Sequence, residues 1–282
     1  MSLPTEVLPY RTTIHSDSSM KIKTYTLYII GLLLTACSHI EEGERLIYVK
    51  PASVARSVLL EDFTGQRCVN CPKGTEVIEQ LQEEYGDAII AVGIHGGPLG
   101  FMGSNTLVGL ATEVGNEYYD HWQLEYQPVG LVNRHGAVNY TDWTTTVRAQ
   151  LAITAPLSME ALASIQDDKI EISTTITGID GNTTGKLQLW VLEDGITAMQ
   201  LMPDGTANSE YIHNHVLRIP VNGTWGEDFT IQEGETKTTR HTQTLDPLWN
   251  SQQLSIVAFV YNDQGVQQAV KTKVNNNDDN IQ

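Results

Sequence analysis

One short stretch, residues 62–73, constrains the fold of this chain more than any other; it reads Asp-Phe-Thr-Gly-Gln-Arg-Cys-Val-Asn-Cys-Pro-Lys. An apolar run at residues 58–60 leads into it, and residues 75–85 after it carry apolar side chains at helical spacing. The pattern therefore predicts Cys68 and Cys71 at a strand-to-helix junction, spaced C-x-x-C. Unpaired backbone N–H groups and the helix dipole favour a thiolate at such a junction.

The same stretch resembles the redox site of thioredoxins, because C-x-x-C beside a strand–helix pattern is typical of them. Thioredoxins also carry an acidic residue six positions before the first cysteine, followed by phenylalanine, and Asp62 and Phe63 match both. Pro128, just before an apolar run, resembles their cis-proline. The resemblance implies that Asp62 is a buried acid that moves protons for the second cysteine and that Pro128 presents the substrate backbone. The chain departs from the family where Arg67 replaces a tryptophan.

Length, charge and cysteine count limit the classes of protein that remain. The chain has 282 residues, enough for two ordinary domains, and 40% of them are hydrophobic. A formal net charge of -17 argues against nucleic acid and against an anionic membrane surface as electrostatic partners. Three cysteines exclude a disulfide-rich scaffold and divide into one pair and one leftover. No motif indicates a cofactor.

The N-terminal region has the features of a bacterial lipoprotein signal. Two lysines follow Met20, residues 25–34 form a short apolar run, and Leu-Thr-Ala leads directly to Cys37. We expect residues 1–36 to be a signal-peptide region whose true start is Met20, and Cys37 to be lipidated and so to attach the chain to the membrane. The alternative is that Cys37 is an ordinary thiol in a cleaved signal. Residues 37–44 are predicted to be a polar tether.

Two regions with different hydrophobic periodicity follow the tether, and the boundary between them lies near Pro156. Residues 45–154 alternate strands and helices in thioredoxin order, so we expect an α/β thioredoxin-like domain. Residues 157–274 show short alternating strands with regular turns, which is typical of an all-β immunoglobulin-like sandwich. Residues 275–282 are expected to be a disordered tail. The predicted strands are 45–50, 55–63, 88–94, 131–134, 137–140, 157–165, 170–176, 187–191, 211–219, 236–244, 254–261 and 266–274, and the predicted helices are 75–85, 107–122 and 142–153.

Two further motifs add a more specific resemblance. Residues 211–218 read Tyr-Ile-His-Asn-His-Val-Leu-Arg, and residues 223–226 read Gly-Thr-Trp-Gly. Together with the lipoprotein signal and the F-T-G-x-x-C-x-x-C-P pattern, they make the chain similar to the Omp-twenty-eight family of outer-membrane lipoproteins from Bacteroidetes. The resemblance implies a place in the outer membrane of the bacterial cell envelope and implies little about chemistry.

The role of the two cysteines stays open between two functions. In the first, the chain is an envelope thiol–disulfide oxidoreductase that acts on protein thiols or disulfides: Cys68 attacks, Cys71 resolves, Asp62 relays a proton and Pro128 docks the substrate. In the second, the chain is a non-enzymatic surface binding or adhesion lipoprotein, and the cysteines form a structural disulfide. Half a zinc site is the least favoured interpretation, because four ligands are needed and no second cysteine pair exists.

Three other positions carry an alternative of their own. His213 and His215 stand two apart on a predicted strand, which would put both on one face; that geometry permits a metal, although packing is the more frequent role. His95 could line the cysteine cleft or be an ordinary loop histidine. Asp62 alternates with apolar residues and is therefore expected to face inward, rather than to be a solvated acid at a strand end.

Overall fold

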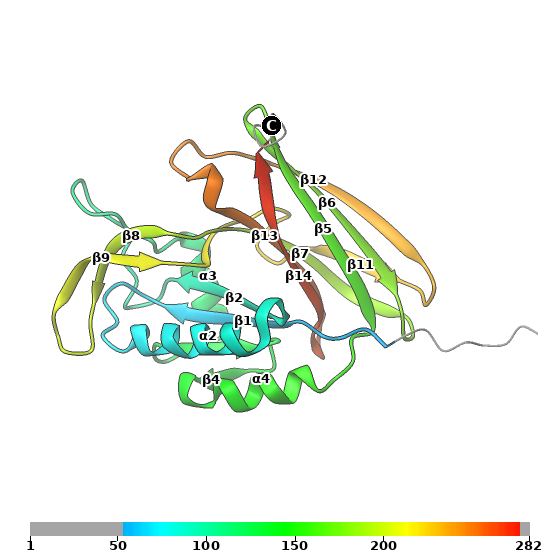
Figure 1. Cartoon of the computed structure of the whole chain (residues 1–282), viewed down its shortest axis with the longest axis horizontal. Helices are drawn as coiled ribbons and strands as arrows, with labels where there is room; N and C mark the ends of the chain where they lie inside the picture. Colours follow the sequence, from blue (N-terminus) through cyan, green and yellow to red (C-terminus); the bar gives the residue numbers. More distant parts are fainter. Residues whose placement is uncertain (1–52, 277–282) are drawn as a thin grey trace, which may run out of the picture. The chain divides into compact units, whose positions relative to one another are not determined.

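A mixed β-sheet runs through the computed structural model, which describes residues 53–276 (Figure 1). Within these residues the sheet has twelve strands: eleven follow the order β12-β6-β5-β14-β13-β7-β10-β2-β1-β3-β4, and the twelfth, β11, pairs with β7 beside this path. Strands β8 and β9 form a hairpin of their own. The strands are β1 (Val58–Thr64), β2 (Ile89–His95), β3 (Val129–Val132), β4 (Ala137–Asn139), β5 (Leu157–Gln166), β6 (Lys169–Gly178), β7 (Thr183–Glu193), β8 (Ile196–Leu201), β9 (Ala207–His213), β10 (Val216–Pro220), β11 (Glu227–Ile231), β12 (Thr236–Thr244), β13 (Leu254–Asn262) and β14 (Gly265–Asn276).

Among residues 53–276, three α-helices pack on the part of the sheet formed by β1, β2 and β3. They are α2 (Cys71–Tyr85), α3 (Glu113–His121) and α4 (Trp143–Leu151), and the short 3-10 turns are η2 (Gly86–Ala88), η3 (Tyr140–Asp142) and η4 (Ser251–Gln253). Helices α2 and α4 share one hydrophobic core with Val58 and Leu60 of β1, whereas α3 shares another with Leu59 and Phe63. Because successive strand residues face opposite sides, β1 is covered on both faces, and all seven of its residues are buried.

The prediction of an α/β thioredoxin-like domain followed by an immunoglobulin-like sandwich is wrong. The strands after residue 157 continue the sheet of the first part, because β10 pairs in parallel with β2 through Val216 and Gly93 and in antiparallel with β7. One core likewise combines Phe63 of β1 with Trp190 of β7 and Phe259 of β13. All described residues lie within one compact unit, residues 51–282. Alternation identifies strands but not their neighbours, and the open edge of β2 is paired by a strand more than 120 residues later in the sequence.

Most individual elements lie where the sequence predicts them, and the exceptions are informative. The predicted strand at 211–219 is interrupted, because β9 ends at His213 and β10 begins at Val216. His215, between them, has a positive φ of 58°, a left-handed conformation that ends the strand. The predicted helix at 107–122 shrinks to α3, β8 and β11 were not predicted, and β14 includes the first two residues assigned to the tail.

Several predictions concern residues outside the described range. The signal peptide, the lipidated Cys37, the tether and the strand at 45–50 all lie outside residues 53–276, as does the tail beyond Asn276. None of the helices within the described range is long and apolar enough to cross a bilayer.

Candidate functional site

The two cysteines of the C-x-x-C motif are joined by a disulfide at the start of helix α2. Asn70 is the N-cap of this helix, Cys71 is its first residue and Pro72 lies in its first turn, where the missing N–H of proline costs nothing. The helix therefore begins four residues before the predicted Thr75. Cys68 lies in the preceding turn, where its N–H donates to the carbonyl oxygen of Gly65.

Both cysteines are buried. Cys68 is 1% exposed and Cys71 is 2% exposed, whereas Arg67 and Val69 beside Cys68 are exposed. The guanidinium of Arg67 lies over the ring of Phe101, 4.9 Å from its centroid, rather than over the sulfurs. The motif therefore presents its flanking residues to solvent and keeps its sulfurs covered.

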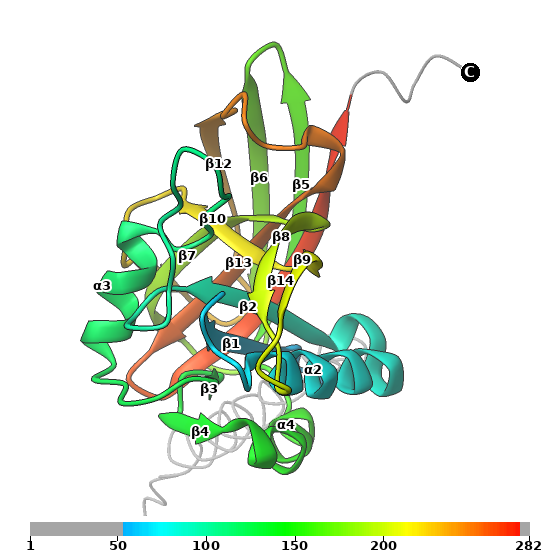
Figure 2. The ribbon, with the colours of Figure 1, turned by 90° about the vertical axis from the view of Figure 1, so that its left-hand side faces the viewer.

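The β8–β9 hairpin contributes a large part of this cover, and glutamine side chains hold it in place. Gln200 of β8 donates from Nε2 to the carbonyl oxygen of Cys68 at 2.9 Å and to that of Gly65 at 3.3 Å. Gln66 is fully buried, and its side-chain Nε2 donates to the carbonyl oxygens of Met199 and Val108. The backbone carbonyl oxygen of Gln66 accepts from the N–H of Leu201. Figure 2 shows the hairpin lying in front of β1 and β2.

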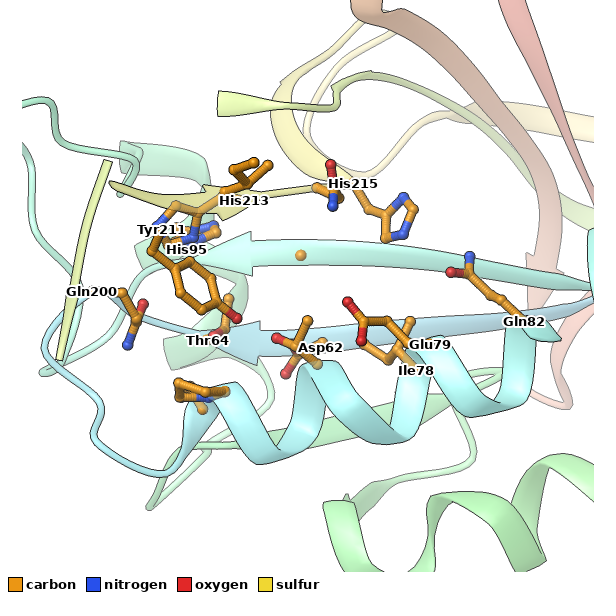
Figure 3. A pocket seen from close by; sticks show the side chains of 16 residues that line it. Asp62, Thr64, Ile78, Glu79, Gln82, His95, Gln200, Tyr211, His213 and His215 are labelled. Atoms are coloured by element: carbon orange, nitrogen blue, oxygen red, sulfur yellow. The ribbon is translucent and has the colours of Figure 1, made fainter. Parts of the chain in front are cut away.

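A cavity of about 220 Å³ lies beneath the hairpin, between β1, β2 and helix α2 (Figure 3). Cys71 and Asp62 line it together with Thr75, and Tyr211 and His213 reach into it from β9. His95, the last residue of β2, lines the same cavity and is not a loop residue. The ends of strands that are distant in sequence thus bring ionisable side chains next to the disulfide.

Asp62 is the most perturbed acid of this cavity. It is 3% exposed, and its Oδ1 has no hydrogen-bond partner among the described residues. Burial raises the pKa of Asp62 to about 8, because the charged form loses its hydration. The carboxyl group is therefore mainly protonated near pH 7, and it can release or take up a proton near neutrality. This placement agrees with an inward-facing acid rather than a solvated one.

Two neutral histidines face each other on the hairpin side of the cavity. The rings of His95 and His213 lie 5.3 Å apart in an edge-to-face arrangement, and Tyr211 lies 4.8 Å from the ring of His213. Burial lowers the pKa of His95 to about 3, with a further contribution from His213, and lowers the pKa of His213 to about 4. Both ring nitrogens of His95 and Nε2 of His213 have no hydrogen-bond partner in residues 53–276. The histidines are thus uncharged at neutral pH.

His215 lies apart from this pair, although the sequence placed it on one face with His213. Its backbone N–H donates to Oδ1 of Asp194 at 2.6 Å, and its ring lies 3.0 Å from the same carboxylate. Lys271 also approaches Asp194. Burial acts to raise the pKa of Asp194, but the hydrogen bonds from His215 and the charges of Lys271 and His215 outweigh it, so the pKa is lowered. The described part of the chain has no group of three or more His, Cys, Asp or Glu side chains that could hold a metal ion.

Pro128 lies beside the first turn of the cysteine helix. The Gln127–Pro128 peptide bond is cis, and Pro128 lies close to Gly74 in the first turn of α2. A side chain at Gly74 would meet Pro128 and the ring of Trp143, so glycine permits the close approach. Gln127 fixes the segment by donating to the carbonyl oxygens of Thr64 and Gly96. Pro128 does not line the cavity that holds Asp62.

The sequence predicted a role for Cys68, Cys71 and Asp62 and did not identify the residues that cover them. Gln66, Gln200 and Tyr211 carry no periodic or motif signal that marks them as site residues. One signal was available: Tyr211 and His213 belong to the 211–218 motif. That motif indicated a family resemblance, however, and not a position near the cysteines.

Comparison with known proteins gives one family and several similar folds. The model of the family described as outer membrane protein Omp28, the Omp-twenty-eight family that the motifs resemble, matches residues 115–278. The structure of HBP35 of Porphyromonas gingivalis aligns with a TM-score of 0.62 at 16% identity, covering 79% of this chain and 76% of that chain. A protein of Agrobacterium tumefaciens aligns with a TM-score of 0.51 at 15% identity, covering 78% of this chain and 95% of the other.

A domain of the outer membrane lipoprotein Omp28 from Porphyromonas gingivalis is 30% identical over 43% of this chain and 90% of that domain, with a TM-score of 0.32. A comparison with curated proteins finds no significant match.

Proposed function

Because this chain belongs to the Omp28 family, whose place is the outer membrane of the bacterial cell envelope, we propose that it is an envelope thiol–disulfide oxidoreductase. The observation that supports the proposal most is the cavity beside the disulfide. It places Cys71 of α2 and Asp62, an acid whose pKa burial raises to about 8, in one space. A disulfide that only fastened a loop would not need a proton donor and acceptor next to it.

The proposed reaction is an exchange of two electrons between this chain and a protein disulfide. In the reduced chain, the Cys68 thiolate attacks one sulfur of the substrate disulfide, forms a mixed disulfide and releases one substrate thiolate. The Cys71 thiolate then attacks Sγ of Cys68, re-forms the internal disulfide and releases the second substrate thiolate. The chain is oxidised and the substrate is reduced, and the reverse sequence oxidises a substrate dithiol.

Asp62 and Pro128 take supporting roles in this proposal. Asp62 accepts the proton of the Cys71 thiol before the second attack and returns it in the reverse direction. Pro128, packed against the first turn of α2 at Gly74, is proposed to hold the backbone of the substrate beside the cysteines. A substrate reaches Cys68 only when the β8–β9 hairpin moves, because Gln200 binds the carbonyl oxygen of Cys68 in the closed arrangement.

The burial of both sulfurs favours a second candidate function. A disulfide that is 1–2% exposed at both cysteines and covered by a hydrogen-bonded hairpin has the surroundings of a structural cross-link. In this alternative the chain is a binding or adhesion lipoprotein, and the disulfide stabilises the junction of β1 and α2.

The experiment that separates the two functions is a redox titration with a trapping variant. The potential of the Cys68–Cys71 pair is measured in glutathione buffers, and reduction of a model disulfide protein, insulin, is followed with time. We expect a potential well above the roughly −300 mV below which structural disulfides resist reduction, and a stable mixed disulfide of Cys71→Ser with insulin through Cys68. The Cys68→Ser variant is the matched control and should trap nothing. A potential below that value together with no trapped species would establish the structural alternative.

A further inference from the structure

A second cavity, of about 730 Å³, lies on a different part of the molecule. It opens between the end of α3, the turn after β3 and the strands β7, β11 and β13, and it shares no lining residue with the cysteine cavity. We call it the tryptophan pocket and define it by Trp122, Arg134, Lys186, Trp225, Asp228 and Tyr261. Trp225 belongs to the Gly-Thr-Trp-Gly motif, which has no part in the cysteine chemistry.

Arg134 gives the pocket a buried donor group that its protein partners leave incomplete. Its Nε donates to Oε1 of Glu61 at 2.7 Å, and the two side chains are 2% and 1% exposed. Its guanidinium lies 4.2 Å from the ring centroid of Tyr261 and 4.8 Å from that of Phe259. Both Nη1 and Nη2 have no hydrogen-bond partner among the described residues. A buried donor without a partner is costly, so a bound acceptor at this point would stabilise the pocket.

Trp122 adds a further buried donor, and Trp225 supplies a flat ring that its neighbours hold in place. Nε1 of Trp122 is also buried and unpartnered within residues 53–276. The ring of Trp225 is held from several sides: His121 lies 4.1 Å from its centroid, Tyr118 lies 5.0 Å from it, and its Nε1 donates to Glu117. The carbonyl oxygen of Trp225 in turn accepts from the hydroxyl of Tyr261. A ring fixed in this way loses little entropy when a ligand packs on it.

The rim of the pocket carries carboxylate groups, and these limit which ligand charge the pocket can accept. The side chain of Asp228 is 94% exposed and pairs with Lys186 at 2.7 Å, and Asp263 also lines the pocket. Glu61 already balances the charge of Arg134. The rim thus carries two carboxylates, Asp228 and Asp263, against the single ammonium group of Lys186, which disfavours an anionic ligand on a chain whose formal net charge is -17.

We propose that the tryptophan pocket binds a neutral saccharide. A sugar presents hydroxyl groups that both donate and accept hydrogen bonds, which suits donors inside the pocket and carboxylates at its rim. The apolar face of a pyranose ring suits the fixed ring of Trp225, and the pocket volume falls in the range of small-ligand sites. The proposal does not depend on the cysteine chemistry.

The test uses the full chain purified in detergent. The protein is applied to an array of neutral, sialylated and sulfated glycans, and the strongest neutral glycan is then titrated by calorimetry. We expect binding to neutral glycans, and about a tenfold weaker affinity in Trp225→Ala, which corresponds to about 1.4 kcal/mol. Trp249→Ala is the matched control, because Trp249 is also partly buried but packs elsewhere, beside Arg218, and its affinity should be unchanged.

A second variant keeps the test decisive if Trp225→Ala fails to fold. Asp228→Ala removes an acceptor that is almost fully exposed, so folding is preserved, and we expect about threefold weaker binding, which corresponds to roughly 0.7 kcal/mol. The proposal is overturned by the absence of glycan binding, by binding that is restricted to anionic glycans, or by affinities in the pocket variants equal to that of Trp249→Ala.

Discussion

Replacing Asp62 by asparagine should remove a pH dependence of stability that is opposite in direction to that of acids whose pKa is lowered by an ion pair. Burial raises the pKa of Asp62 from 3.8 to about 8. A raised folded-state pKa means that the stabilising contribution is fully present below the unfolded-state pKa and is lost as pH rises through the folded-state pKa. The window therefore runs from about pH 4 to about pH 8, because within it the folded chain keeps Asp62 mainly protonated while the unfolded chain releases that proton, which increasingly favours unfolding.

The magnitude follows from the two pKa values. Each pH unit within the window costs about 1.4 kcal/mol, so the free energy of unfolding of the wild type should fall by about 3–4 kcal/mol between pH 5 and pH 8 relative to Asp62→Asn. The comparison with the variant is necessary because other groups titrate as well. His95 and His213 have lowered pKa values, so their contribution is lost as pH falls below about 6.5, and this loss is common to both proteins.

Urea unfolding of the disulfide-bonded protein at pH 5, 6, 7 and 8 measures the difference. Asp228→Asn is the control, because the carboxylate of Asp228 is exposed and paired with Lys186, and the difference in free energy of unfolding between this variant and the wild type should be the same at every pH. If the gap between wild type and Asp62→Asn were the same at pH 5 and pH 8, Asp62 would not be a protonated buried acid. Its proposed role as a proton relay would then fail with it.

Two further predictions concern the cover of the cysteines and the membrane anchor. Gln200→Ala removes hydrogen bonds to the carbonyl oxygens of Cys68 and Gly65 and should lower the free energy of unfolding by about 1–3 kcal/mol. Alkylation of Cys68 in the reduced Gln200→Ala protein should be faster than in the reduced wild type. Gln252→Ala, at an exposed position, is the control, and an alkylation rate in Gln200→Ala equal to that of this control would show that the hairpin does not limit access to Cys68. Cys37→Ser should release the protein from the membrane fraction, and intact mass of the native protein should show acyl chains on Cys37; an unmodified residue there would refute the anchor.

Local patterns were sufficient for the elements around the cysteines. The continuous apolar run of β2 and the apolar positions of β1 identified buried strands, and helical spacing after Thr75 identified α2. Asp62 could be placed on an inward face because strand residues alternate. These inferences succeed because each depends on residues within about ten positions of one another.

The pairing of distant strands could not be predicted in the same way. Gln200 binds the carbonyl oxygen of Cys68 across 132 residues, and the contact is made by one amide group that leaves no periodic trace in the sequence. Most residues of β9 are not buried, so alternation there was weak, and the left-handed His215 that separates β9 from β10 is not a glycine. The continuous sheet was missed for the same reason, since alternation in β10 does not reveal that its partner is β2.

The β8–β9 hairpin is the element on which the two candidate functions differ physically. If it stays closed, the disulfide remains buried and acts as a cross-link. If it opens, Cys68 is exposed, and opening breaks the two hydrogen bonds from Gln200 to the carbonyl oxygens of Cys68 and Gly65 and the two that join Gln66 to Met199 and Leu201. At about 1 kcal/mol for each of these four bonds, opening would cost on the order of 4 kcal/mol, so the open state would be populated at about one part in a thousand. Thiol–disulfide exchange through so small a population is slow unless the substrate itself holds the hairpin open. A disulfide partner that binds β8 or β9 would therefore react with the cysteines in preference to a small thiol such as glutathione.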